Sequence, residues 1–313
     1  MTKSMKSGRK PKLVRTVGLK YRGISCRTRK RYEQQLCIFF EHLKRHNIPL
    51  PSSYRLLDKT MADYIDHMFL DGEPIGYAGD LISAMSRFNP MSRLRIPTTR
   101  LWFRNWQREV IRVRALPIPA KACQGLAGIA LAMRRVDLAA LLPLGFLCML
   151  RTGELLSVRP KDVTFSPFSS SAIIALPQTK TSGPNTEEVV LQDELAVQAL
   201  KLACAVTEIN EPIYARKPKF LGEDLRWLGR LVGFEHKRFT PYSLRRGGAT
   251  WHFHKYGSLH LTAVAGRWKQ ERTAKIYIDG AAAEWASWQF GPLGDKMLRR
   301  CAKAFHKRFT TVQ

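Results

Sequence analysis

Three separate segments of this sequence carry residue types that could transfer a phosphoryl group to a protein hydroxyl. One begins Arg-Thr-Gly-Glu at Arg151, the second contains Arg245, and the third contains Trp268 and, nine residues later, Tyr277. Two guanidinium groups on one phosphate neutralise the charge that repels an oxyanion nucleophile and stabilise the transition state, and a tyrosine can be that nucleophile. The sequence therefore predicts that these segments meet in one site.

Tyr277 requires help to act as a nucleophile. The unperturbed pKa of tyrosine is near 10, so only about a thousandth of it is phenolate at pH 7. We expect Arg151 and Arg245 to supply that help through their charge. A single tyrosine on an amphipathic helix is otherwise a core residue, so the interpretation depends on the other segments.

Arg151 directly follows the apolar stretch 138–150, for which the sequence predicts a buried helix. If helical geometry continues, Glu154 lies one turn further on. The functional interpretation of Arg151 is a fork that binds two phosphate oxygens and is oriented by this carboxylate. The alternative is an arginine at a helix end that satisfies backbone carbonyls.

The segment around Arg245 also predicts a helix, because Pro241 suits a first helical turn. Tyr242 and Arg245 then lie one turn apart on the same face. The following pair, Gly247-Gly248, lets another element approach closely. The alternative is a helix with an exposed double arginine and a packing pair of glycines.

The composition indicates a polyanionic partner. Lys and Arg number 52 against 25 Asp and Glu, a formal net charge of +27. Such a surface favours nucleic acid, although charge alone does not separate DNA from RNA. The carboxylates form no compact metal-binding pattern and no phosphate-binding glycine loop is present, so we expect neither metal nor other cofactor.

The chain carries no signal for export or for a membrane span. Its first residues are basic and polar, and the longest apolar run, 138–150, is too short to span a bilayer. The six cysteines are scattered, which is typical of reduced thiols. We expect an intracellular protein, in the nucleus of a eukaryote or otherwise in the cytoplasm or nucleoid. The basic stretch 6–12 is a nuclear import signal, a phosphate-binding arm or a disordered tail.

A length of 313 residues predicts two domains. We predict a flexible basic arm over 1–26, a helical DNA-binding domain over 27–115, a linker over 116–120, and a domain with the candidate site over 121–313. Apolar periodicity predicts four helices in the first domain. Their ranges are 28–45, 59–70, 77–87 and 101–115.

The second domain is expected to be mainly helical with a small antiparallel sheet. Helices are predicted over 121–134 and 138–150, and strands over 171–176 and 187–191 flank a loop rich in turn residues. Helices resume at Asp193, and the fold class is therefore mainly α with a small antiparallel β-sheet.

Basic side chains on the predicted helices are candidates for contact with phosphates. On the fourth helix they alternate with Trp102 and Trp106. The alternative is an ordinary solvated face with core tryptophans. The candidate DNA-binding residues are Lys30, Arg31, Lys44, Arg45, Arg104, Arg108, Arg112 and Arg246.

Taken in order, these motifs resemble the active-site signature of the tyrosine recombinases, the phage-type integrase family, over nearly the whole chain. The resemblance implies a helical core-binding domain, a catalytic domain and strand exchange through a 3′-phosphotyrosyl intermediate, without ATP or metal. It implies a homotetramer on paired double-stranded DNA sites. The roles it implies are Arg151 and Arg245 on the phosphate, Glu154 in support, Lys180 as the acid for the departing 5′ oxygen, Trp268 as a hydrogen-bond donor to the phosphate and Tyr277 as nucleophile.

Tyr242 departs from the family pattern, in which many members carry histidine. A neutral phenol is a poor base at pH 7, although it donates a hydrogen bond. A DNA-binding protein that kept the fold but lost turnover is therefore a second hypothesis, and a basic RNA-binding protein is a third. By analogy with the family, Trp285, Trp288 and Phe290 are candidates for docking on a neighbouring protomer, or they pack within their own chain.

Overall fold

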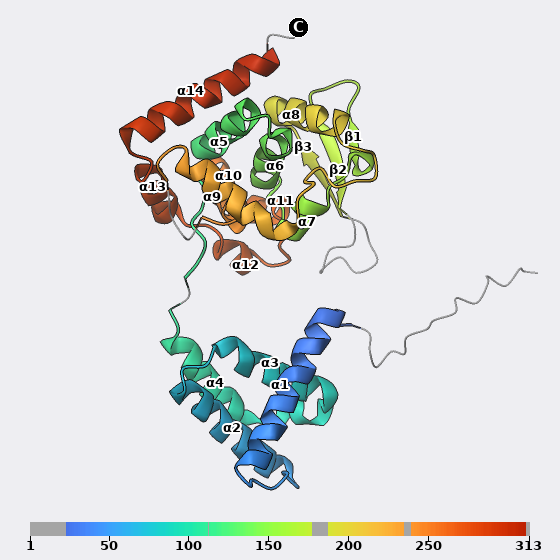
Figure 1. The fold of residues 1–313 in the computed structure, drawn as a ribbon, viewed down its shortest axis with the longest axis vertical. Helices are drawn as coiled ribbons and strands as arrows, with labels where there is room; N and C mark the ends of the chain where they lie inside the picture. Colours follow the sequence, from blue (N-terminus) through green and yellow to red (C-terminus); the bar gives the residue numbers. More distant parts are fainter. Residues whose placement is uncertain (1–22, 112, 177–186, 235–238, 311–313) are drawn as a thin grey trace, which may run out of the picture. The chain divides into compact units, whose positions relative to one another are not determined.

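The chain divides into two compact units, Met1–Arg112 and Val113–Gln313. The computed structural model describes residues 23–111, 113–176, 187–234 and 239–310 (Figure 1). Leu116 and Ile118, from the segment predicted as a linker, are buried in the core of the second unit. The linker itself stays a prediction.

The first unit is helical, and each of its four predicted helices is present. The fourth begins with Pro97 in its first turn, where the missing N–H of proline costs nothing, and ends at Glu109 instead of residue 115. The elements are α1 (Cys26–Arg45), α2 (Tyr54–Leu70), α3 (Ile75–Phe88), the 3-10 helix η2 (Pro90–Leu94) and α4 (Pro97–Glu109).

The core of the first unit lies among these helices and is built from residues at helical spacing. Phe39 and Leu43 of α1 pack with Met61 and Ile65 of α2. Phe40, which follows Phe39 on α1, is 45% exposed. Adjacent residues on a helix are about 100° apart, and Phe39 occupies the inner position.

Asp58 fastens α2 to the beginning of α4. Its buried carboxylate accepts hydrogen bonds from the backbone N–H of Thr98 at 3.0 Å and of Thr99 at 2.8 Å. Burial alone would raise the pKa of Asp58, but the hydrogen bonds from Thr99 and Thr98 outweigh it and hold this pKa below its usual value. A side chain of one helix thus satisfies the free amides of another.

The second unit is mainly α-helical with one small antiparallel sheet, and it confirms the predicted fold class. Its elements are α5 (Ala120–Ala132), α6 (Val136–Leu147), α7 (Thr152–Ser157), η3 (Pro160–Asp162), β1 (Val163–Phe165), β2 (Ala172–Leu176), β3 (Glu187–Leu191), α8 (Glu194–Ala205), η4 (Pro218–Phe220), α9 (Leu221–Arg230), α10 (Tyr242–Tyr256), α11 (Leu259–Ala265), α12 (Glu271–Lys275), α13 (Gly280–Trp288) and α14 (Gly291–Thr310).

The sheet has the order β1-β2-β3, with Ile174 of β2 opposite Val163 of β1 and Val189 of β3. Strands β2 and β3 were predicted, whereas β1 was not. Three residues are too few for an alternating pattern to stand out. Along β2, Ile174 is buried and Ile173 is exposed, so one face of the sheet covers the core.

Helices α5 and α14 lie side by side in the second unit (Figure 1). Their contact depends on two glycines of α5, because a Cβ at Gly125 would lie 2.6 Å from the Leu298 side chain. At Gly128 a Cβ would lie 2.2 Å from the backbone oxygen of Cys301.

Among the described residues, no helix is both long and apolar enough to cross a membrane.

We predict that Gly128→Ala lowers the free energy of unfolding of this unit by about 1–3 kcal/mol, because the new methyl group meets backbone that cannot rotate away. Urea denaturation followed by circular dichroism measures the change. The matched control is Gly153→Ala, whose added Cβ meets nothing within 4 Å. Equal unfolding midpoints for the two variants would show that the close contact between α5 and α14 carries no stability.

Candidate active site

The site is built around Arg245, which lies in the first turn of α10 and is only 1% exposed. Its guanidinium donates to the carbonyl oxygen of Met149, and to that of Gly266 at 2.8 Å. Its buried Nε has no hydrogen-bond partner in the part of the chain that the structure describes. The charged group is therefore held by two backbone carbonyls, and its Nε donor is unused within the described ranges.

Those two carbonyls come from two helix ends of the same geometry. Helix α6 ends at Leu147, and Met149 takes a left-handed φ of 47°. Helix α11 ends at Ala265, and Arg267 takes a left-handed φ of 56°. The backbone N–H of the next residue returns to the helix in each case, from Leu150 to Gly145 and from Trp268 to Ala263.

The prediction that the helix over 138–150 carries Arg151 at its end is therefore wrong. The helix stops three residues before Leu150, at Leu147, and Met149 turns the chain. Arg151 instead precedes the separate short helix α7 as its N-cap residue. Partial negative charge at helix carboxyl ends favours a cation nearby, so the two turns also stabilise Arg245.

Glu154 orients Arg151 as expected, although the contact joins the N-cap and the third residue of α7 and does not lie within a continuous helix. The backbone N–H of Arg151 donates to the Glu154 carboxylate at 2.9 Å, and the Arg151 guanidinium forms an ion pair with it. The Glu154 side chain is 6% exposed and that of Arg151 is 30% exposed. A buried carboxylate thus holds a guanidinium that still reaches solvent.

Arg267 belongs to the site and was missed in the sequence. Its Nη2 donates to Glu154 and its Nε to Glu187 of β3 at 3.2 Å. Glu154 is therefore shared between Arg151 and Arg267. The only sequence signal was the position of Arg267 beside Trp268, which does not indicate that its partners lie more than 70 residues away.

Tyr277 follows α12 and lies within an aromatic group. Its ring centroid is 4.6 Å from that of Trp268 and 5.5 Å from that of Tyr242, whose hydroxyl donates to the Tyr277 hydroxyl. The Arg245 guanidinium lies 4.4 Å from the Trp268 ring centroid and 5.4 Å from the Tyr277 ring centroid. The segments around Arg245, Trp268 and Tyr277 therefore meet, and Arg245 connects them to the chain just before Arg151.

The loop with Tyr277 is fixed to α10 on both sides of the tyrosine. Thr250 donates to the Tyr277 carbonyl at 3.4 Å and accepts from the Asp279 N–H at 3.1 Å. Arg246 forms an ion pair with Asp279 at 3.1 Å. The alternative of an exposed double arginine is wrong, because Arg245 and Arg246 are both buried.

Glycines make this close packing possible. A Cβ at Gly247 would lie 2.2 Å from the carbonyl oxygen of Ile118, and one at Gly248 would lie 1.9 Å from that of Phe146. The predicted close approach to this pair is thus confirmed. At Gly266 a Cβ would meet the Trp268 ring at 1.9 Å, so the indole occupies space that only glycine leaves open.

The surroundings separate the two phenols in acidity. Burial raises the pKa of Tyr277, but hydrogen bonds from Tyr242 and Trp268 and the charge of Arg245 outweigh it, so this pKa lies below its usual value. Burial and the hydrogen bond to Tyr277 raise the pKa of Tyr242. Tyr277 therefore loses its proton before Tyr242 does.

Arg245 stays charged despite its burial. Burial and the nearby charge of Arg151 lower the pKa of Arg245 to about 10. This value is well above neutral pH, so the guanidinium is cationic under physiological conditions. Tyr277 thus faces a fixed positive charge that has little access to water.

The remaining predicted residues are placed as follows. Lys180 and Arg112 lie outside the described residues. Arg246 is engaged with Asp279, and its role in DNA binding stays a prediction. Arg31 is exposed and donates to Asp80 of α3 at 2.8 Å. The other predicted DNA-binding residues of the first unit are exposed side chains of α1 and α4, namely Lys30, Lys44, Arg45, Arg104 and Arg108.

The aromatic residues near the carboxyl end differ in their environment. Phe290 is buried and its ring is stacked on Phe234 at 4.7 Å, so it packs within its own chain. Trp288 is 67% exposed and Trp285 is 36% exposed. Of the three candidates for docking, only the two tryptophans present surface.

Comparisons with known proteins define the fold. Neither a family model nor a curated protein matches the sequence. Among solved structures, the Tn1549 transposon integrase in complex with circular intermediate DNA is similar over 84% of this chain and 98% of its own, with a TM-score of 0.57 and 12% identity. A lambda integrase dimer bound to a COC′ core site is similar over 85% and 93%, with a TM-score of 0.55 and 18% identity.

A lambda integrase tetramer bound to a Holliday junction is also similar, with a TM-score of 0.51 and 18% identity over 83% of this chain and 74% of its own. All three structures are integrases in complex with DNA. The chain therefore has the tyrosine recombinase fold, which confirms the fold expected from the motifs.

We predict that Tyr242→Phe raises the pKa of Tyr277, because the substitution removes a hydrogen bond that stabilises the phenolate. At a fixed pH near this pKa, less Tyr277 is then ionised. A pH titration of protein labelled with ¹³C at the tyrosine Cζ measures it, with Tyr277→Phe assigning the signal. Tyr256→Phe, at the exposed end of α10, is the control. A Tyr277 pKa that does not move in Tyr242→Phe would contradict this account of its acidity.

Proposed function

We propose that this protein cuts and rejoins DNA. The Tyr277 hydroxyl attacks a DNA phosphate, the bond to the 5′ oxygen breaks, and a 3′-phosphotyrosyl bond forms. The phenol proton is lost, and the departing 5′ oxygen takes up a proton to become a hydroxyl. Attack by a 5′-hydroxyl of another strand reverses the step and releases Tyr277.

The observation that carries this proposal is the buried Arg245 guanidinium beside Tyr277, within the tyrosine recombinase fold. A phosphate in contact with Arg245 lies next to the nucleophile. The lowered pKa of Tyr277 increases the fraction of phenolate, and the hydrogen bond from Tyr242 orients its hydroxyl.

Arg151 supports phosphate binding from the second side. Glu154 and Arg267 fix its position, and its partial exposure leaves donors available for phosphate oxygens. Because Arg151 lowers the pKa of Arg245, the two guanidinium groups repel one another when no anion is bound. A phosphate that contacts both groups would relieve that repulsion.

The proposal assigns the proton for the departing oxygen to Lys180, by resemblance. An ammonium group is a suitable general acid for an alkoxide. The exchange of one phosphodiester bond for one phosphotyrosyl bond conserves its energy, so the step as written uses neither ATP nor metal. The proposal includes action as a homotetramer on two DNA sites, and the lambda integrase of similar fold is a tetramer when bound to a Holliday junction.

Exposed basic side chains of the first unit are proposed to hold the duplex. Lys44 and Arg45 lie at the end of α1, and Arg104 and Arg108 lie on α4. Contacts of this type release counterions from DNA, so the affinity falls steeply as salt rises.

We predict that a nicked suicide duplex traps a covalent complex with the protein. The duplex is built from DNA beside the coding region, with any inverted or split direct repeats found there as the first choice, and denaturing electrophoresis detects the adduct. Tyr277→Phe abolishes the adduct because it lacks the nucleophile. Arg245→Lys slows adduct formation by about 10²-fold or more, because a single ammonium group replaces the planar guanidinium with its several donors. Tyr256→Phe, also a loss of one hydroxyl in this unit, forms the adduct at the normal rate.

Circular dichroism and DNA binding should be unchanged in Tyr277→Phe, so that loss of the adduct reports on chemistry. An adduct that persists in this variant would place the nucleophile elsewhere. The absence of an adduct from the unmodified protein on every flanking repeat would count against the enzymatic function itself.

A second candidate function is DNA binding without efficient turnover. The observation that favours it is Tyr242, because its raised pKa keeps it protonated, and a protonated phenol cannot accept the proton of Tyr277. This protein would bind duplex DNA in a salt-sensitive manner and would form little adduct.

We predict that Tyr242→His distinguishes the two functions. An imidazole accepts a proton near neutral pH, so this variant increases adduct formation at least tenfold if the missing base is what limits the protein. The measurement is the single-turnover rate on the same suicide duplex. Efficient strand exchange by the unmodified protein, with no gain in Tyr242→His, would eliminate the second function.

A further inference from the structure

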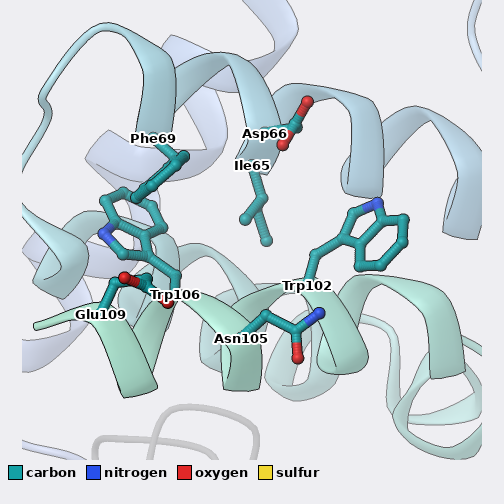
Figure 2. A pocket seen from close by; sticks show the side chains of 7 residues that line it. All are labelled: Ile65, Asp66, Phe69, Trp102, Asn105, Trp106 and Glu109. Atoms are coloured by element: carbon teal, nitrogen blue, oxygen red, sulfur yellow. The ribbon is translucent and has the colours of Figure 1, made fainter.

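The helical unit contains a pocket of about 270 Å³ between α2 and α4 (Figure 2). Its lining is aromatic and apolar with acidic groups, which is unusual for a chain of net charge +27. The indoles of Trp102 and Trp106 lie on either side of Ile65 (Figure 2). Asp66 from α2 and Glu109 from α4 contribute carboxylates.

The floor and one wall of the pocket are rigid. Ile65 is 1% exposed and belongs to the core, and Trp106 packs edge-on against Phe69 with ring centroids 5.6 Å apart. Trp102 on the other side is 40% exposed, so its indole presents a free face. The hydrogen bonds from Thr98 and Thr99 to Asp58 hold α2 and α4 together, so the pocket exists before anything binds.

Helix α4 has two faces of opposite character. Trp102, Asn105, Trp106 and Glu109 are spaced three and four residues apart and line the pocket together. Arg104 lies about 160° and Arg108 about 120° from Trp102 around the helix axis, and both side chains are exposed. The face proposed to bind phosphates is therefore not the face of the pocket.

The charge of the pocket excludes phosphate and attracts a cation. Neither Asp66 nor Glu109 forms an ion pair with any residue in the described ranges. A phosphate would be repelled by both carboxylates. A cation would gain from them and from the faces of the two indoles.

We propose that this pocket binds an arginine side chain of a partner protein. The methylene groups would lie on Ile65 between the indoles, and the planar guanidinium would stack on Trp102 and donate to Asp66 or Glu109. The volume is below the range usual for small-molecule sites and suits one long side chain. Arginine fits better than lysine, because a guanidinium stacks on an aromatic face and reaches a carboxylate with two parallel donors.

The test uses the full-length protein with ¹⁵N-labelled tryptophan and the peptide Ac-Gly-Arg-Gly-NH₂. We expect the peptide to shift the indole N–H signals of Trp102 and Trp106 in a saturable manner. The same peptide with citrulline, which is neutral and nearly isosteric, should bind at least fivefold more weakly, and the lysine peptide should bind with intermediate affinity. Equal binding of the citrulline peptide, or the absence of saturable shifts with arginine, would overturn the proposal.

Variants locate the interaction. Glu109→Gln and Trp102→Leu should each weaken arginine binding about threefold to tenfold, as expected for one carboxylate or one indole face. Asp63→Asn is the matched control, because Asp63 is an exposed carboxylate of α2 outside the pocket. Equal weakening by Asp63→Asn would show only a general attraction to negative charge and would overturn the site.

Addition of duplex DNA distinguishes the pocket from the phosphate-binding face. Arginine binding should persist in the presence of DNA, because the two ligands use different faces of α4. Displacement of the peptide by DNA would make the pocket part of a nucleic-acid surface, contrary to the proposal. This outcome is independent of strand cleavage, so the proposal does not depend on catalytic activity.

Discussion

The hydrogen bonds of Arg245 to two backbone carbonyls are the constraint on which the site depends. The Met149 carbonyl follows the end of α6, and the Gly266 carbonyl follows the end of α11. Arg151 follows Met149 by two residues, and Trp268 follows Gly266 by two residues. One buried cation therefore sets the separation of the groups that would meet a phosphate. A lysine in its place could reach one carbonyl but could not span both with a planar fork.

Much of the helical framework could be predicted, because apolar periodicity reports directly on the buried face of a helix. The ends of helices were less accessible. Left-handed residues after helices are usually glycine, and here they are Met149 and Arg267, so the turn that separates Arg151 from α6 left no mark in the sequence. Strand β1 was missed because it is only three residues long.

Within the site, segments with a family pattern were found and their long-range partners were not. The grouping of Arg245, Trp268 and Tyr277 followed from motifs. The pairing of Arg151 with Glu154 was expected from a continuing helix, whereas the structure forms it as the capping interaction of α7. The links from Arg267 to Glu187 and from Arg246 to Asp279 join residues 80 and 33 positions apart. Such links depend on the folded topology, and no local pattern encodes them. The glycines at positions 247 and 248 indicated a close approach but not which element would approach.

The hydrogen bond between Tyr242 and Tyr277 has a consequence for selectivity in the resting protein. An incoming group must interrupt or share this bond before it reaches the Tyr277 oxygen, at a cost of about 1 kcal/mol. A ligand with several acceptor oxygens compensates for that loss by engaging the guanidinium groups at the same time, whereas a small neutral electrophile does not. The hydrogen bond from Tyr242 therefore makes the Tyr277 hydroxyl less reactive toward adventitious reagents than toward a polyvalent anion.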